Sequence, residues 1–209
     1  SLMGISLDES KMLILGATGA IGRHCAKFFS PSVGRLELYG KNLAKLEDVL
    51  LEVRSYTYKR KILKSDNPEK SVCHSDIVIV TGKGMFFNLG LLKPKSLVCD
   101  ATYPHTILLE KKKRDDIFVM EGAAVRVPQE ARFNFYFGLP PGLAYPCMAE
   151  PMILALENRF ESFSLGKKID YSKVREISEL AENHNFKMAG LISFGKMVHD
   201  EEVKKFRRN

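Results

Sequence analysis

Short apolar runs alternate with longer amphipathic stretches along the first 120 residues. Residues 11–15 are apolar and bounded by glycine, as in a buried strand, and residues 20–29 have the apolar spacing of a helix. The alternation then repeats, and it predicts a second helix at 43–53 and further strands at 36–39, 76–80, 97–99 and 117–120. Short β-branched runs that alternate with helices predict an α/β fold with a doubly wound, mostly parallel sheet.

The pattern changes after about residue 123. Four prolines between residues 128 and 146 indicate a loop, with one extended piece in the FNFYF stretch at 133–137. Two helices are predicted beyond it, the second after a cap at Asp170 or Ser172. Their apolar faces are formed by Ala149, Met152, Ile153, Leu156 and Phe160, and by Val174, Ile177 and Ala181. We expect both C-terminal helices to pack back on the sheet, so that residues 1–209 form one domain.

The turn between the first strand and the first helix reads GATGAIG. Gly16 would allow a tight turn, Gly19 would let the backbone approach a pyrophosphate, and Gly22 would let the helix pack close to the strand. This is the setting of a Rossmann-like dinucleotide site, in which the helix N-terminus adds partial positive charge. The alternative is a purely structural turn. The residues predicted to bind a cofactor here are Gly16, Ala17, Thr18, Gly19, Ala20, Ile21 and Gly22.

The end of the second predicted strand favours one nicotinamide cofactor over the other. NAD sites usually place Asp or Glu there to bind the ribose 2′-hydroxyl. This chain reads Tyr39-Gly40-Lys41-Asn42 instead, and Lys41 is suited to a 2′-phosphate. NADPH is therefore the predicted cofactor, and the alternative is that Lys41 is an ordinary surface lysine.

Two further turns should lie at the carboxyl edge of the sheet, where open α/β sheets bind ligands. Thr81 and Gly82 follow the strand at 76–80 and are predicted to touch the cofactor. Thr102 and Tyr103 follow the strand at 97–99 and are predicted to border the nicotinamide. His105 lies near the same crevice and is a candidate general acid.

Composition and charge exclude several classes of protein. No run of about 18 apolar residues is present to span a membrane, and the N-terminus lacks the order of a secretory signal. The net charge is +7, but the basic clusters at 111–114 and 204–208 are not interleaved with aromatic residues, so nucleic acid is not an expected partner. The four cysteines are scattered without metal-ligand spacing, so no metal site is expected. We expect a cytoplasmic protein whose basic faces are either solvated or bind an acidic partner such as a carrier protein.

Three stretches carry a resemblance to a known family: GISLDESKMLILGATGAIG, DATYPH, and the segment that begins AYPCMAEPM at Ala144. Over nearly the whole chain the sequence resembles the aldehyde-forming long-chain fatty acyl-carrier-protein reductases. The resemblance implies a shikimate-dehydrogenase-like NADPH-binding sheet and an acyl thioester substrate, carried by acyl carrier protein or coenzyme A. It also implies that Cys147, three residues before Glu150, is the nucleophile that carries the acyl group before hydride transfer gives the aldehyde.

The same resemblance implies that this chain is one part of a longer protein. The family has an N-terminal acyl-binding domain, so we expect this chain to be part of a longer protein and to reduce long-chain thioesters poorly by itself. Pro146 and Pro151 flank the cysteine segment, which leaves open whether Cys147 lies inside the first helical turn or just before it.

Other functions remain open on sequence grounds. A short-chain reductase is not expected, because no tyrosine has a lysine four residues later. The two alternatives are an NADP-binding sensor or interaction module without turnover, and a dehydrogenase of a small hydroxy or amino acid without covalent catalysis. Acyl length and oligomeric state are not predicted.

Overall fold

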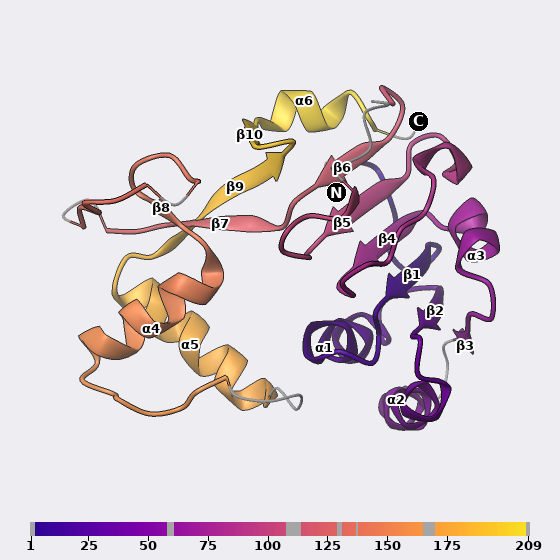
Figure 1. Cartoon of the computed structure of the whole chain (residues 1–209), viewed down its shortest axis with the longest axis horizontal. Helices are drawn as coiled ribbons and strands as arrows, with labels where there is room; N and C mark the ends of the chain where they lie inside the picture. The colour runs from indigo at the N-terminus through magenta and orange to yellow at the C-terminus, as the bar shows by residue number, and fades with distance from the viewer. Residues whose placement is uncertain are drawn as a thin grey trace. The chain divides into compact units, whose positions relative to one another are not determined.

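The computed structural model describes residues 3–57, 61–107, 114–128, 131–136, 138–164 and 170–207. Where a single domain was expected, the contacts of the chain divide it into two compact units. The first unit is Ser1–Glu121 with Ser193–Asn209, and the second is Gly122–Ile192 (Figure 1). Each unit has its own sheet and its own apolar core, and they are described in turn.

The first unit contains a six-stranded sheet of order β3-β2-β1-β4-β5-β6, in which the neighbouring strands run parallel. This order confirms the predicted α/β class, because it is the one typical of doubly wound dinucleotide-binding sheets. The strands are β1 (Lys11–Leu15), β2 (Arg35–Tyr39), β3 (Lys61–Lys64), β4 (Ile77–Val80), β5 (Leu97–Asp100) and β6 (Phe118–Met120).

Most helices of the first unit connect these strands, namely α1 (Ala20–Phe29), α2 (Leu43–Tyr56), α3 (Pro68–His74) and the 3-10 turn η1 (Leu89–Leu91). Helix α6 (Asp200–Lys204) follows β10. Asn42 and Asn67 cap α2 and α3, since their side chains accept hydrogen bonds from the backbone N–H groups of Lys45 and Lys70. Helix α1 has no such cap, because its N-cap residue is Gly19.

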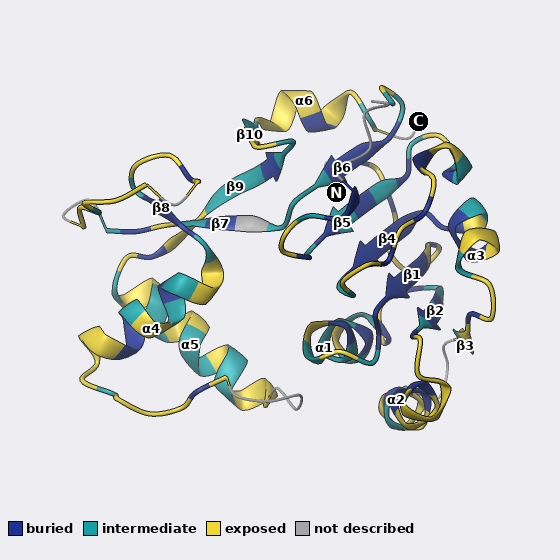
Figure 2. Ribbon diagram, viewed as in Figure 1, coloured by how far each residue is buried: buried dark blue, intermediate teal, exposed yellow. Residues whose placement is uncertain are grey.

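The core of the first unit lies on both faces of its central strands. β4 is buried along its whole length, and β1 is buried except at Lys11 (Figure 2). Strands covered by helices on both sides show continuous apolar runs rather than alternation. The runs at 12–15 and 77–80 are of this kind. The side chains on one face of them, Leu13, Leu15, Val78 and Val80, belong to one cluster with Val72, Phe87, Leu92, Val98 and Ile107.

The second unit is built on antiparallel strands and two helices. Strand β7 (Ala123–Arg126) pairs with β8 (Leu143–Ala144) and β9 (Lys187–Ser193) in a sheet of order β10-β9-β7-β8. Its edge strand β10 (Lys196–Val198) falls in the chain range of the first unit. The helices are α4 (Pro146–Leu156) and α5 (Tyr171–Asn183). Asp170 caps α5 by accepting a hydrogen bond from the Ser172 N–H, so of the two residues predicted as caps it is Asp170 that occupies this position.

The packing of these two helices differs from the expectation that they cover the parallel sheet. Their apolar faces are buried against strands of their own unit, in a core formed by Val127, Ala144, Ala149, Ile153 and Phe186. A helical apolar face shows that something must cover it, but not which strand does so. Residues 133–136 of the predicted extended piece form a loop without strand pairing, and residue 137 lies outside the described residues.

Candidate functional site

The glycine loop lies where the strand order of the first sheet reverses. Strands β1 and β4 are neighbours, but the chain continues from β1 to β2 on one side and from β4 to β5 on the other (Figure 1). In open α/β sheets this reversal leaves a crevice at the carboxyl ends of the two strands, where ligands bind. The loops after β1 and β4 flank that position.

Two glycines of the loop are required by its backbone. Gly16 has φ +92°, and a Cβ there would lie 2.4 Å from the backbone nitrogen of Gly82. A Cβ on Gly22 would lie 2.3 Å from the carbonyl oxygen of Gly16. Thr81 fixes the same turn, because its hydroxyl donates to the carbonyls of Leu15 and Gly16, each at 3.1 Å. The predicted residues Thr81 and Gly82 therefore shape the glycine loop.

Gly19 is a different case. Its φ is −79°, and a Cβ would meet only the Gly16 carbonyl oxygen, at an ordinary contact distance of 3.4 Å. As the N-cap of α1 it offers no side-chain acceptor, and the first turn of the helix contains no acidic residue. No side-chain acceptor therefore occupies the backbone N–H groups in the exposed first turn of α1, so these groups can bind an anion.

The remaining residues of the loop support this arrangement. The N–H groups of Gly16 and Ala17 donate to the Tyr39 carbonyl at 3.0 and 2.9 Å, which ties the loop to the end of β2. Thr18 packs there too, since its Cγ2 lies 2.7 Å from where a Cβ of Gly40 would be. The predicted residues that are exposed are Gly19 and Ile21, with Thr18 and Ala20 partly so.

Lys41 reaches the same edge of the sheet from the turn after β2. Its Nζ lies 3.9 Å from where a Cβ of Gly84 would be, so the ammonium group stands beside the loop that follows β4. Tyr39, Gly40 and Asn42 surround Lys41 in the chain, and none is a carboxylate. The turn thus brings a cation, rather than an acid, to the end of β2.

The loop after β5 is organised by a buried carboxylate that sequence reasoning did not single out. Asp100 is fully buried, and its oxygens accept from the N–H groups of Thr102, Thr106 and Ile107 at 2.8–3.1 Å. The Thr102 hydroxyl also donates to Asp100, at 2.6 Å. An aspartate at a strand end followed by two threonines was the available signal for such a turn.

Because of these hydrogen bonds, Thr102 and Tyr103, the two residues predicted to border the nicotinamide, have different surroundings. Thr102 is buried, and its side chain is engaged inside the loop with Asp100 and Thr106. Thr102 therefore holds the loop in place. The Tyr103 ring is 71% exposed, and it is presented at the carboxyl edge of β5.

Cys147 is the second residue of α4 and is exposed. Pro146 occupies the first helical position and Tyr145 the N-cap, without a side-chain hydrogen bond to the helix and without an acidic residue in the first turn. This places Cys147 within the first turn, the point that the sequence left open. A thiol at a helix N-terminus lies near partial positive charge that stabilises a thiolate.

The neighbours of Cys147 along α4 have separate roles. Glu150 accepts a hydrogen bond from the Ser164 hydroxyl at 2.6 Å, which holds the loop after α4. Pro151 lies inside the helix and has no N–H, so the carbonyl of Cys147 lacks its usual bond from four residues later.

The other cysteines contrast with Cys147. Cys147 is exposed, whereas Cys25, Cys73 and Cys99 are partly buried. Burial raises the pKa of the Cys25 thiol, which makes it a poorer nucleophile at neutral pH. Among the described residues no group of three or more His, Cys, Asp or Glu side chains is arranged to hold a metal ion.

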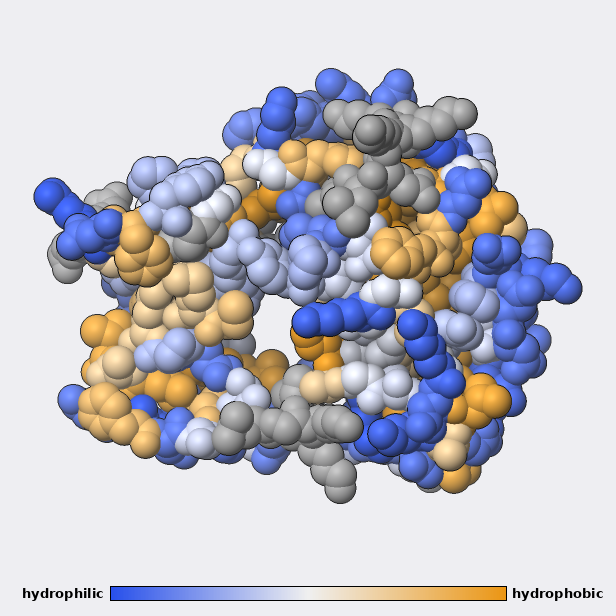
Figure 3. Space-filling model, in the orientation of Figure 1, coloured by the Kyte–Doolittle hydropathy of each residue, from blue (hydrophilic) through white to orange (hydrophobic). Residues whose placement is uncertain are grey.

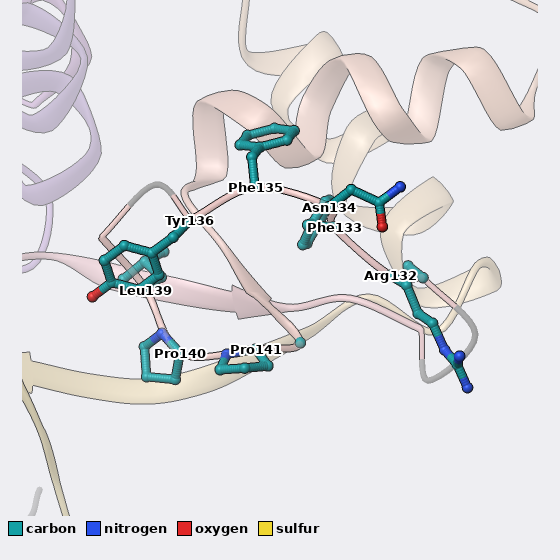
Figure 4. Close-up of a pocket in the computed structure, with 10 residues that line it drawn as sticks. Arg132, Phe133, Asn134, Phe135, Tyr136, Leu139, Pro140 and Pro141 are labelled. Atoms are coloured by element: carbon teal, nitrogen blue, oxygen red, sulfur yellow. The ribbon is translucent and has the colours of Figure 1, made fainter.

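The second unit also contains a cavity of about 570 Å³ in the loop before β8 (Figure 4). Half of its ten lining residues are aromatic or proline, namely Phe133, Phe135, Tyr136, Pro140 and Pro141, and the lining also contains Arg132 and Asn134. The loop contacts the N-cap of the cysteine helix, because the Tyr145 hydroxyl oxygen lies 3.5 Å from where a Cβ of Gly138 would be. On the visible face, hydrophobic residues gather in the region of α4 and α5 (Figure 3). Leu156 at the end of α4 and Phe160 in the loop that follows are exposed.

The chain is similar to parts of longer known proteins. The chain is 28% identical over 215 residues to the aminotransferase PigE of a Serratia strain, covering all of this chain and 25% of that protein. It is 25% identical over 199 residues to the long-chain acyl-[acyl-carrier-protein] reductase of Synechococcus elongatus, covering 90% of this chain and 56% of the reductase. The chain thus spans a quarter and about half of these relatives, and no family model matches it.

Solved structures are similar over about half of the chain. Quinate dehydrogenase from Corynebacterium glutamicum in complex with NAD covers 46% of this chain and 37% of its own, with 15% identity and a TM-score of 0.41. A shikimate 5-dehydrogenase from Mycobacterium fortuitum covers 49% of this chain and 41% of its own, with 16% identity and a TM-score of 0.35.

Two expectations drawn from composition concern membrane-spanning helices and the basic clusters. Within the described ranges, no helix has the length and apolar character needed to cross a membrane. Of the basic clusters, residues 111–113 and 208 lie outside the described residues.

Proposed function

We propose that this chain supplies the NADPH-dependent reductase part of an enzyme that converts a fatty acyl thioester to an aldehyde through an acyl thioester on Cys147. The observation that carries the proposal is an exposed cysteine in the first turn of an uncapped helix. The same chain has a dinucleotide-type sheet with an uncapped glycine loop.

The broader part of this proposal has the firmer support. The strand order, the glycine loop and the weak similarity to an acyl-carrier-protein reductase all favour an NAD(P)-dependent oxidoreductase-type domain. The finer part, acyl thioester reduction, draws on that similarity and on Cys147. The cavity of the second unit offers a hydrocarbon chain the apolar side chains of Phe133, Leu139 and Pro140.

The residues at the carboxyl edge fit a nicotinamide dinucleotide. The Gly19 backbone leaves room where a pyrophosphate would approach the first turn of α1, and Lys41 offers charge for a 2′-phosphate. When bound, the cofactor would supply a hydride for the carbonyl carbon. The exposed Tyr103 would border the nicotinamide ring.

The chemistry assigned to the second unit begins with the Cys147 thiolate. It attacks the substrate carbonyl carbon, and the carrier leaves as a thiolate, so that one thioester replaces another. Addition of a hydride to the new thioester carbonyl and cleavage of its carbon–sulfur bond release the aldehyde and return the cysteine as a thiolate. Glu150 is bound to Ser164 and is assigned a structural role rather than that of a base.

The proposal is tested by supplying the full-length gene product with an acyl thioester and NADPH and identifying the product by mass spectrometry. Long-chain aldehyde formed in proportion to NADPH consumed supports acyl thioester reduction. NADPH binding without consumption would favour a sensor. NADPH oxidation only with small oxo or imino acids would favour a dehydrogenase.

We expect Lys41→Ala to weaken NADPH binding at least about tenfold and to leave NADH binding unchanged. A charge-assisted hydrogen bond to a phosphate contributes about 1.5–3 kcal/mol to binding. NADH has no 2′-phosphate, so its binding does not depend on this bond. Calorimetric titration with both cofactors measures the difference. Lys45→Ala, which removes an exposed lysine four residues later, is the matched control. Equal affinity of the natural protein for both cofactors would contradict this role of Lys41.

We expect Gly19→Ala and Gly16→Ala to fail in different ways. Gly19→Ala should lower the free energy of unfolding by less than about 1 kcal/mol, the usual difference between glycine and alanine at an N-cap, but weaken NADPH binding, because its Cβ points into the space proposed for the pyrophosphate. Gly16→Ala should lower the free energy of unfolding by about 1–3 kcal/mol, because of its positive φ and its contact with Gly82. Urea denaturation and cofactor titration of both variants separate the effects. Unchanged NADPH affinity in Gly19→Ala would count against the pyrophosphate site.

A further inference from the structure

We propose that the adenine base of the dinucleotide stacks on the phenyl ring of Phe86. The inference rests on the cofactor named in the proposed function, and it adds a contact that recognises the base rather than the phosphates. It is drawn only from described residues of the first unit, in the turn that follows β4 and the turn that follows β2.

The turn that follows β4 lies beside the turn that follows β2. The two approach each other at Lys41, whose Nζ lies 3.9 Å from where a Cβ of Gly84 would be. In dinucleotide-binding sheets the residue at the end of the second strand faces the ribose of the adenosine. Lys41 has that place in this chain, so Gly84 and the residues that follow it lie at the adenosine end of the proposed cofactor site.

Contacts within the first unit hold the turn after β4 in place. The Met85 N–H donates to the Gly82 carbonyl at 3.3 Å, and Gly84 between them has φ +67°. The Met85 side chain packs on Gly82, since a Cβ there would lie 2.8 Å from the Met85 Cγ. On its other side, Gly82 touches Gly16 of the glycine loop. The turn is therefore fixed against the loop that is proposed to bind the pyrophosphate.

Phe86 is exposed although both of its neighbours are buried. Met85 and Phe87 are 9% and 4% exposed, whereas Phe86 between them is 68% exposed. Met85 and Phe87 both belong to the apolar core cluster that contains the central strands. The backbone is thus anchored on both sides of Phe86, and its ring is left at the surface two residues after Gly84.

An exposed phenylalanine is not by itself a sign of a ligand, because single apolar side chains are common on protein surfaces. Phe86 is distinguished by its place at the carboxyl edge of a dinucleotide-type sheet, on a turn that the Lys41 ammonium group approaches. An aromatic ring near a cation suits a flat base whose ribose carries a phosphate. Every base has a π face that can stack on such a ring, whatever its hydrogen-bonding groups.

The two residues should therefore recognise different parts of the cofactor. Lys41 is proposed to bind the 2′-phosphate, which only NADPH has. Adenine is common to NADPH and NADH, so the loss of the Phe86 ring should weaken the binding of both. This difference in pattern separates a stacking contact from a phosphate contact.

The test is calorimetric titration of the full-length gene product with NADPH, NADH and adenosine 2′,5′-bisphosphate, which is the adenosine end of NADPH alone. We expect Phe86→Ala to weaken the binding of all three by about tenfold, the loss typical of removing a base-stacking ring. A tenfold loss corresponds to about 1.4 kcal/mol. The thermal midpoint should be unchanged, because the ring is exposed and its neighbours form the core contacts.

Two further replacements distinguish stacking from a general apolar contact. Phe86→Tyr keeps an aromatic ring and should keep the affinity, whereas Phe86→Leu keeps the apolar character without the ring and should bind as weakly as Phe86→Ala. Phe28→Ala is the matched control. Phe28 is 53% exposed in the last turn of α1, at the opposite end of that helix from the glycine loop, so its loss should leave all three affinities unchanged.

Each remaining outcome decides against the stacking role. If the natural protein binds NADPH and Phe86→Ala binds it equally well, the role is overturned and the proposed cofactor stands. A loss confined to NADPH would assign Phe86 to the 2′-phosphate instead, and full affinity in Phe86→Leu would show a contact that needs no aromatic ring. If the natural protein binds neither NADPH nor NADH, the proposed cofactor fails, and the stacking role fails with it.

Discussion

Cys147→Ser abolishes aldehyde formation and leaves NADPH binding intact, if Cys147 carries the acyl group. Serine keeps the shape of the side chain, but its hydroxyl is a far weaker nucleophile than a thiolate at neutral pH. We expect the loss to exceed about 1,000-fold, because removal of a covalent nucleophile removes the pathway rather than one contact. The measurement is peptide mass spectrometry after incubation with an acyl thioester without NADPH, followed by an aldehyde assay with it.

The control for this experiment is Cys73→Ser. Cys73 lies in α3, is partly buried and takes part in none of the proposed chemistry. The acyl mass should appear on the peptide that contains Cys147 in both the natural protein and Cys73→Ser, and on no peptide of Cys147→Ser. A Cys147→Ser variant that still forms aldehyde at the natural rate would exclude the covalent mechanism.

Asp100→Ala lowers the free energy of unfolding by about 3 kcal/mol or more. The substitution leaves the N–H groups of Thr102, Thr106 and Ile107 buried without their acceptor, and each such loss costs about 1–3 kcal/mol. Urea denaturation measures the change, with an unchanged slope as the sign that the transition stays two-state. Asp115→Ala, at an exposed position of the same unit, should change stability by less than about 0.5 kcal/mol. A loss below about 1 kcal/mol in Asp100→Ala would show that the loop is held by other contacts.

The parts of the fold that are determined locally could be predicted from the sequence. The bounds of β1 and α1 match the prediction because the glycine turn between them is specified by the residues that form it. Strand β3 was missed because it has only four residues, two of them lysine, and gives no apolar run. Strands β7 and β9 were missed because their pairing joins residues about 65 positions apart, which local periodicity does not encode.

The candidate site also has features that the sequence indicates and features that only the structure shows. The sequence context pointed to the glycine loop, and the proline before Cys147 is the residue type that begins helices. Two features could be found only in three dimensions: the contact of Gly16 with Gly82, and the approach of Glu121 to His105. Both join residues from different strands at one edge of the sheet. Their relation depends on strand order rather than on spacing along the chain.

The uncapped start of α1 sets a limit on engineering this protein for heat resistance. Replacing an N-cap glycine by serine, asparagine or aspartate is a common stabilising substitution. At position 19 the new side chain would occupy the N–H groups that the cofactor is proposed to use. A library screened for melting temperature alone would therefore enrich variants that are more stable and no longer bind NADPH. Selection for heat resistance should keep position 19 fixed and place new caps elsewhere.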